Sequence, residues 1–166
     1  MSQRSASWSF QEEDARRIRE VLDAFLAGSA AHAALLVDRN GQLILGAGDI
    51  HGFDSTAFAS LAAADFSAND QLASLMGEQE FSSLFHQGEK ESMYLADVGR
   101  RVILVALFGE EATLGMIRIK ARAAVRELSG IVAELFDRSA STGMAQLESS
   151  WLDEAESEID RLFGSL

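Results

Sequence analysis

Three strand-like runs late in the chain constrain the fold most, because the turns that separate them are short. The runs cover residues 81–87, 92–97 and 101–108, and the residues that interrupt them include Gly88-Glu89-Lys90 and Val98-Gly99-Arg100. A parallel connection needs a crossover of about a dozen residues, and neither gap offers one. Consecutive strands are therefore predicted to pair antiparallel, as a meander.

An Asn-Gly turn predicts another antiparallel pair nearer the N-terminus. Asn40 and Gly41 separate the apolar runs Ala34–Val37 and Leu43–Leu45. Both turn residues tolerate a positive φ, which the tight turns of hairpins require. The segment is therefore expected to form a β-hairpin.

Helical spacing of apolar residues marks a segment before the hairpin and another after the meander. Ser9 and Glu12 form a capping-box pattern ahead of the first helix, which Gly28 ends. The later helix is expected from about Thr113 to Asp137. Helices set around an antiparallel sheet predict an α+β sandwich, with residues 9–137 as its domain.

A helix predicted between the hairpin and the meander carries two different stripes. Asp54 can cap it, and helical spacing continues to about Met76. The apolar side chains expected to be buried are Phe58, Leu61, Ala62, Leu72, Leu75 and Met76. A second stripe, mostly of small residues, holds Ala57, Ser60, Ala64, Ser67, Gln71 and Ser74. The pattern alone leaves open whether this stripe is plain surface, internal packing or an intermolecular contact.

The C-terminal part is expected to form a linker and a short helix. Residues 138–150 are predicted as a flexible linker, because Ser, Thr and Gly are frequent in their first half. Residues 151–166 are predicted as an amphipathic helix, and its large apolar side chains are Trp151, Ile159, Leu162 and Phe163. Short helices are marginal in water by themselves. The segment therefore docks either on its own domain or on a partner, and the sequence leaves both possibilities open.

Composition and motifs exclude several classes of function. The net charge of −12 disfavours nucleic acid and anionic membranes as partners. No apolar run approaches the roughly 20 residues of a membrane span, and the first residues lack the apolar stretch of a secretion signal. The chain has no cysteine and three separate histidines, so no metal site is expected. These features favour a cytoplasmic protein.

Catalytic and nucleotide-binding motifs are also missing from the sequence. Neither a phosphate-binding loop nor a dinucleotide-binding glycine pattern at the required spacing is present. A nucleophile elbow of the Gly-x-Ser-x-Gly type is likewise missing. The chain is therefore expected to have no cofactor and no catalytic residues of its own.

Several segments resemble a known family when they are taken in order. The hairpin sequence of residues 35–44, LLVDRNGQLI, is similar to the first hairpin of the roadblock (dynein light chain-like) family. The strings FHQGEKESMYL at 85–95, VGRRVILV at 98–105, TLGMIR at 113–118 and EIDRLF at 158–163 resemble its MglB-type branch. The resemblance covers about residues 11–163, which is nearly the whole chain.

The resemblance implies a fold and an activity that periodicity does not show. It implies a five-stranded antiparallel sheet with the second helix on one face and the first and last helices on the other. It also implies a homodimer that pairs through its third strands and second helices, and that docks one MglA-type Ras-like GTPase. The dimer would promote GTP hydrolysis in the control of bacterial cell polarity and motility. Its C-terminal helix would act in nucleotide exchange or in holding the GTPase.

The resemblance also assigns roles to residues of this chain. GTPase-docking positions on the second helix would be Ala64, Ser67, Ala68 and Gln71, and the C-terminal contacts would be Trp151, Ile159, Leu162 and Phe163. Polar residues such as Asp65, Asn69 and Asp70 depart from the family pattern on this helix. Two alternatives stay open, namely a roadblock scaffold that binds a GTPase without altering hydrolysis, and an enzyme or ligand sensor that uses the acidic surface.

Overall fold

The computed structural model describes residues 10–163, except for the side chains of residues 148, 156, 159, 160, 162 and 163. The chain forms two units, one of residues 11–133 and another that includes residues 134–163. In chain order the elements are α1 (Glu12–Ser29), β1 (Ala33–Asp38), β2 (Leu43–Gly48), α2 (Ser55–Leu75), β3 (Ser83–Gln87), β4 (Ser92–Val98), β5 (Val102–Phe108) and α3 (Leu114–Phe163). The predicted order of elements is therefore confirmed.

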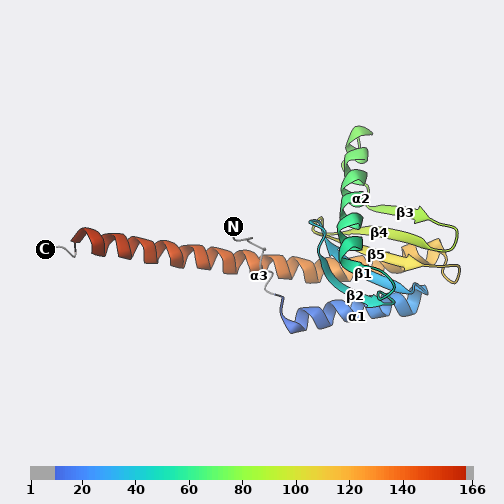
Figure 1. Ribbon diagram of the computed structural model, residues 1–166, viewed down its shortest axis with the longest axis horizontal. Coiled ribbons are helices and arrows are strands. Elements are labelled where there is room, and N and C mark those ends of the chain that lie inside the picture. Colours follow the sequence, from blue (N-terminus) through green and yellow to red (C-terminus); the bar gives the residue numbers. More distant parts are fainter. Residues whose placement is uncertain (1–9, 164–166) are drawn as a thin grey trace. The chain divides into compact units, whose positions relative to one another are not determined.

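The five strands form one antiparallel sheet in the order β2-β1-β5-β4-β3 (Figure 1). The late runs pair as the predicted meander, β3 with β4 and β4 with β5. The early hairpin joins this meander because β1 pairs with β5. As a consequence, β2 and β3 are the two edges of the sheet.

The hairpin turn between β1 and β2 is held by a carboxylate as well as by glycine. Gly41 has a φ of +90°, whereas Asn40 has no positive φ. Asp38 Oδ1 accepts hydrogen bonds from the backbone N–H groups of Asn40 and Gln42, at 2.9 Å each. The predicted hairpin is present, and its turn is an aspartate-stabilised loop.

The start of α1 differs from the predicted capping box. Gln11 is the N-cap, and the box pairs it with Asp14 in place of Ser9 and Glu12. Asp14 Oδ2 accepts from the backbone N–H of Gln11 at 3.2 Å. Ser9 lies outside the described residues. The cap of α2 agrees with the prediction, because Asp54 accepts from the N–H groups of Thr56 and Ala57.

One hydrophobic core lies between α2 and the sheet. Phe66 is fully buried at its centre, among alanines of the helix and β-branched or leucine side chains of the strands. The cluster consists of Leu35, Val37, Ala59, Ala62, Ala63, Phe66, Leu95, Ile103 and Val105. The hairpin also approaches α2 closely, since a Cβ added at Gly41 would lie 2.9 Å from Ser60 Cα.

The buried side of α2 agrees with the prediction only in part, since Ala62 lies in the core and Phe58 packs against it. The sequence places Leu61, Leu72, Leu75 and Met76 in the core, and all four are exposed. The alanine side of the helix packs on the sheet because small side chains allow the helix to approach closely around Phe66. The large side chains are left on the far side of the helix.

The opposite face of the sheet carries α1 and the first part of α3 (Figure 1). Strand residues alternate between faces, so Leu36 and Leu104 point away from α2 while Leu35 and Ile103 point toward it. The side chains that α1 and α3 bury include Ile18, Leu22, Phe25, Ile117, Ala121 and Leu128. The packing of helices on both faces of the sheet confirms the α+β fold.

Residues 138–150 are helical where the sequence predicts a linker. Their hydroxyl groups bond to the backbone one turn earlier: Ser141 Oγ donates to the Asp137 carbonyl, and Thr142 Oγ1 to the Arg138 carbonyl, at 2.9 Å each. Such bonds satisfy the side chains without ending the helix. Serine and threonine content is thus a poor predictor of a break in this segment. Among the described residues, no helix is long and apolar enough to cross a membrane.

Arg39 ties three elements together at the edge of the α2 core. Its guanidinium bonds to Asp70 of α2 at 2.6 Å and also to Asp97 of β4, and it lies 4.8 Å from the centroid of the Phe66 ring. Burial lowers the pKa of Arg39, but the bonds to Asp70 and Asp97 outweigh burial and leave its pKa raised. The cation therefore persists at any physiological pH and holds α2 against the sheet.

Replacing Phe66 with alanine should lower the free energy of unfolding by about 3–5 kcal/mol, because it leaves a cavity in a fully buried site. Phe53→Ala is the matched control, since Phe53 is 36% exposed in the loop before α2. We expect the control to cost less than half as much. Urea denaturation of both variants measures the difference, and equal losses would contradict the assigned core.

Arg39→Met should cost about 1–3 kcal/mol, because Asp70 and Asp97 would then lose their shared cation. Arg16→Met is the control, since Arg16 pairs with Glu20 on the surface, where such pairs contribute about 0–1 kcal/mol. Equilibrium urea unfolding at neutral pH compares the two. A loss at Arg39 no larger than at Arg16 would show that the cluster does not stabilise the fold.

Candidate functional site

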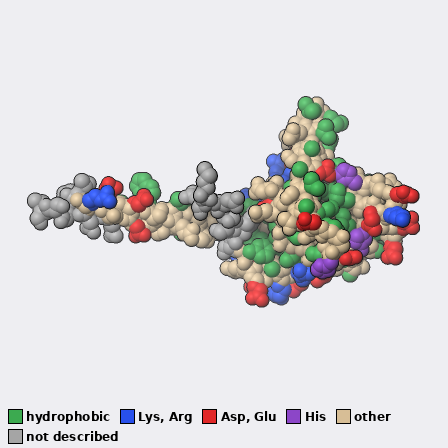
Figure 2. All heavy atoms as spheres, in the orientation of Figure 1, with side chains coloured by type: hydrophobic (Ala, Val, Ile, Leu, Met, Phe, Trp, Pro, Cys, Tyr) green, Lys and Arg blue, Asp and Glu red, His purple; other side chains and the backbone are tan. Residues whose placement is uncertain are grey.

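The side of α2 that faces away from the sheet is an apolar surface. Residues at steps of three and four share this side, opposite Phe66. We call them the outer stripe, which consists of Ala57, Leu61, Ala64, Ala68, Leu72 and Leu75, all exposed. Leu61 is 71% and Leu75 85% exposed, and hydrophobic side chains line α2 up to its C-terminal end in Figure 2. Contiguous exposed apolar side chains are typical of protein interaction sites.

The outer stripe contains no charged residue, and both carboxylates of α2 are paired with residues outside the helix. Asp65 Oδ2 lies 2.6 Å from His86 Nε2 on β3, and Asp70 is held by Arg39. Neither carboxylate is therefore an unpaired surface charge. The His86 contact also connects α2 to the edge strand β3. It therefore holds the outer stripe in a fixed position relative to the open edge of β3.

The four docking positions expected on α2 all lie on its exposed side. Ala64 and Ala68 belong to the outer stripe, while Ser67 and Gln71 flank it on one side. The sequence reasoning missed Leu61, Leu72 and Leu75, because it assigned large apolar side chains to the core. The signal that could have identified them is the second, alanine-rich apolar side of the same helix.

The edge strand β3 lies next to the overhanging end of α2. In Figure 1 the C-terminal end of α2 reaches beyond β3, where Leu72 and Leu75 are exposed. β3 pairs with β4 only, so its outer edge has backbone groups without a strand partner in the described chain. An open edge beside an apolar helix end is a surface on which a second sheet can continue.

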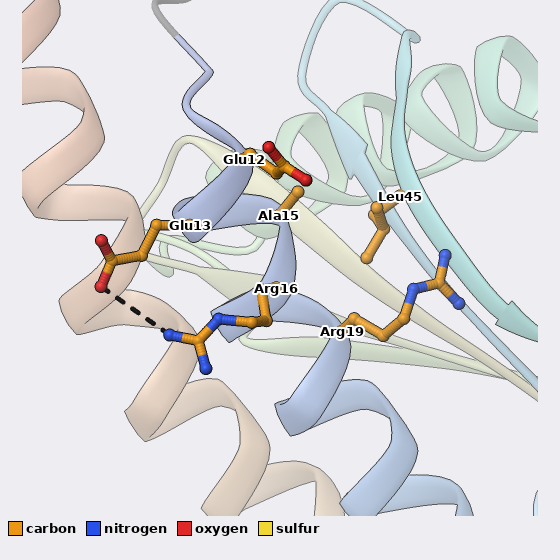
Figure 3. A pocket seen from close by; sticks show the side chains of 6 residues that line it. All are labelled: Glu12, Glu13, Ala15, Arg16, Arg19 and Leu45. Atoms are coloured by element: carbon orange, nitrogen blue, oxygen red, sulfur yellow. Dashed lines mark ion pairs between the residues drawn. The ribbon is translucent and has the colours of Figure 1, made fainter.

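The hollow shown in Figure 3 is lined mainly by charged residues of α1, in contrast to the apolar outer stripe. It lies between α1 and β2, measures about 730 Å³ and is lined by Glu12, Glu13, Ala15, Arg16, Arg19 and Leu45. Arg16 faces Glu13 at 3.8 Å and Glu20 at 3.2 Å, so its charge is neutralised locally. No group of three or more histidines and carboxylates that could hold a metal ion occurs within residues 10–163.

The arginine pair at the β4–β5 turn is not arranged as a free catalytic cation. Arg100 has a φ of +61°, and its backbone N–H donates to Asp97 at 3.0 Å. Its guanidinium Nε lies 2.9 Å from Glu80, which follows α2 in the chain. Arg100 is therefore engaged within its own chain.

The C-terminal unit has an apolar surface of its own. Trp151 is 75% exposed, and Met144, Leu147 and Leu152 are exposed on the same helix. The predicted contacts Ile159, Leu162 and Phe163 lie in α3, and their side chains are outside the described residues. The structure therefore adds three exposed apolar residues, which the sequence reasoning placed in a linker or did not single out.

Solved structures of known proteins share this arrangement of sheet and helices. Myxococcus xanthus MglB is 40% identical with a TM-score of 0.72, and the match covers 76% of this chain and 95% of that chain. The gliding protein MglB from Thermus thermophilus is 30% identical with a TM-score of 0.71, covering 77% and 97%. A structure described as MglB with tetrameric arrangement is 30% identical with a TM-score of 0.72, covering 78% and 97%.

A family model agrees with these structural matches. Comparison with curated protein sequences gives no match. The model of the Roadblock/LC7 domain matches residues 17–108, which run from within α1 to the end of β5 and include the whole of α2. With its five-stranded sheet, its α2 layer and this match, the chain belongs to the Roadblock/LC7 domain family and is similar to MglB proteins.

Proposed function

We propose that this chain regulates an MglA-type Ras-like GTPase and promotes its GTP hydrolysis, without catalytic residues of its own. The observation that carries the proposal is the outer stripe, an uncharged apolar side of α2 that the fold leaves uncovered. The likeness to MglB of Myxococcus xanthus supports this reading. The cytoplasm, and a cell pole within it, is the proposed location.

The proposed active form is a homodimer in which the β3 edges pair and the α2 helices pack side by side. Two features support it: the open edge of β3 and the exposed Leu72 and Leu75 at the overhanging end of α2. A twofold axis beside β3 would bring each overhanging end over the partner's sheet. The paired helices would then form one continuous platform for a single GTPase.

The proposed docking positions on this platform are Ala64, Ser67, Ala68 and Gln71, whose short or uncharged side chains allow a close approach. We further propose that Trp151, Ile159, Leu162 and Phe163 contact the same GTPase from the C-terminal helix, and that this contact assists nucleotide exchange. Exposure of Trp151 supports the proposal for that residue.

The proposed mechanism is conformational. GTP hydrolysis needs an oriented water and stabilisation of the charge that develops on the phosphate, and an arginine can provide the latter. Arg100 is bonded to Glu80, which argues against its insertion into another protein's site. The dimer would instead bind the hydrolysis-competent conformation of the GTPase more tightly than its other states, and so increase its population.

A scaffold that binds a GTPase without altering hydrolysis is the alternative function. The outer stripe would serve this role equally well. GTP turnover by the GTPase, measured with and without this chain, separates the two. An unchanged turnover rate despite binding would favour the scaffold.

Ala64→Arg combined with Ala68→Arg should reduce stimulated GTP hydrolysis to the unstimulated rate, because two large cations would occupy the docking positions. Ala24→Arg with Ala27→Arg is the matched control, since both alanines are exposed on α1. Turnover of the GTPase is the readout, and sedimentation checks that both variants keep the parent's oligomeric state. Full stimulation by the α2 variant would place docking elsewhere.

Arg100→Ala combined with Arg101→Ala should leave stimulated hydrolysis within about twofold of the parent, because catalysis is proposed to use no arginine from this chain. An arginine supplied from outside typically accounts for roughly 10³–10⁵ in rate. Single-turnover GTP hydrolysis distinguishes these outcomes. A collapse to the unstimulated rate would overturn the conformational mechanism.

A further inference from the structure

The first part of α3 has an exposed surface with apolar and basic character. Ile119 is 63% and Met116 43% exposed on the side of the helix that faces away from its buried residues. Ala123 follows at helical spacing, and Arg122 and Arg126 are exposed beside it. We call these five residues the α3 face.

The arginines of the α3 face are not paired with a carboxylate of the described residues. No carboxylate lies within ion-pair distance of Arg122 or Arg126 in the part of the chain that the structure describes. Residues 114–133 contain four basic side chains and one acidic one, a local net charge of +3 in a protein of net charge −12. The α3 face is thus a local positive region on an acidic protein.

The C-terminal segment, residues 138–163, has the opposite charge and a matching apolar stripe. It contains six carboxylates and two arginines, a net charge of −4. Met144, Leu147 and Trp151 recur at steps of three and four on one side, and each is exposed. Asp153 lies on the opposite side of the helix, so the segment is amphipathic and acidic.

We propose that the C-terminal segment of one copy of this chain docks on the α3 face of a second copy. Opposite charges favour this pairing, whereas two C-terminal segments of net charge −4 repel each other. Charge complementarity is the argument for pairing the segment with this face. Docking within one chain is the opposing outcome, and the dependence of association on protein concentration distinguishes it from docking between copies.

The sizes and shapes of the two surfaces suit a helix-to-helix contact. A helix rises by about 1.5 Å per residue. The exposed side of α3 from Met116 to Gly130 is therefore about 21 Å long, and the apolar stripe from Met144 to Ala155 is about 16 Å long. Nothing lies within 4 Å of a Cβ added at Gly130, so a large side chain can approach there. Trp151 beside Ala123 and Arg126 would gain both apolar burial and a cation–π contact.

The contact would link dimers into larger assemblies, in addition to the proposed pairing through β3 and α2. The C-terminal segment would then be shared between two uses, contact with a GTPase and contact with another copy. Experiments on the purified chain without any GTPase test the second use alone. Their outcome is therefore independent of the proposed GTPase function.

Charge reversal in the full-length protein tests the proposal. Sedimentation velocity at low salt should show mass increasing with concentration, and this association should weaken at least tenfold with Arg122→Glu plus Arg126→Glu. Glu154→Lys plus Glu158→Lys, on the same side of the helix as Trp151, should weaken it equally, although these changes reduce the net negative charge. The two variants mixed in equal amounts, or all four changes combined in one chain, should regain association.

Arg100→Glu plus Arg101→Glu is the matched control, because it alters the net charge by the same amount on the β4–β5 turn. The association constant of this control should stay within about twofold of the parent's, because only the general repulsion between more negatively charged copies changes. All changed residues are exposed or lie in turns, and circular dichroism verifies the fold. Equal weakening in the control, or mixtures that fail to associate, would overturn the proposal.

Trp151 provides a second readout. Trp8→Phe leaves Trp151 as the only tryptophan of the chain. Its emission should shift to shorter wavelength as protein concentration rises, and Arg122→Glu plus Arg126→Glu should abolish the shift. A shift that is independent of concentration would show burial within one chain, and no shift would show that the segment stays uncovered. Either result would contradict docking between copies.

Discussion

The packing of Phe66 and its neighbouring alanines on the sheet determines how the rest of α2 is presented. A helix with apolar residues on two opposite sides can bury only one of them against a single sheet. The alanine side is buried because it lets the helix come close, and Gly41 allows the hairpin to meet Ser60 at short range. The leucines of the outer stripe are consequently left in solvent, where the free energy of burying them remains available for binding.

Polar contacts fix the orientation that this packing creates. Arg39 connects α2 to β4 through Asp70 and Asp97, and His86 connects β3 to Asp65. These contacts use both carboxylates of α2 and leave its outer side uncharged. A rigid, uncharged and apolar helix surface can recognise a partner by its shape and by the burial of apolar area.

The two parts of helix α3 differ in burial and in charge. Its first part buries Ile117 and Leu128 against the sheet and exposes a positive α3 face. Its later part has no basic stripe and exposes Leu147 and Trp151 among acidic residues. Large apolar side chains exposed in this way are typical of surfaces that associate with other proteins.

Local sequence signals determined the order and type of the elements. Asp54 caps α2 as predicted, and the turn at Gly41 and the short turns of the meander specify antiparallel neighbours, because each depends on residues close together in the chain. The four α2 residues that the resemblance assigned to GTPase docking, Ala64, Ser67, Ala68 and Gln71, all lie on its exposed side.

Only the tertiary structure decided which apolar side of α2 is buried, because both sides have helical periodicity and the choice depends on the shape of the sheet. It also decided the partners of Arg39, which are 31 and 58 residues away in sequence and are brought together by the pairing of strands. The helix over residues 138–150 was not predicted, because serine and threonine are also frequent where helices end. Here their hydroxyl groups donate to backbone carbonyls one turn earlier, and the helix continues. Periodicity thus predicts elements, while burial follows from how closely their surfaces can approach.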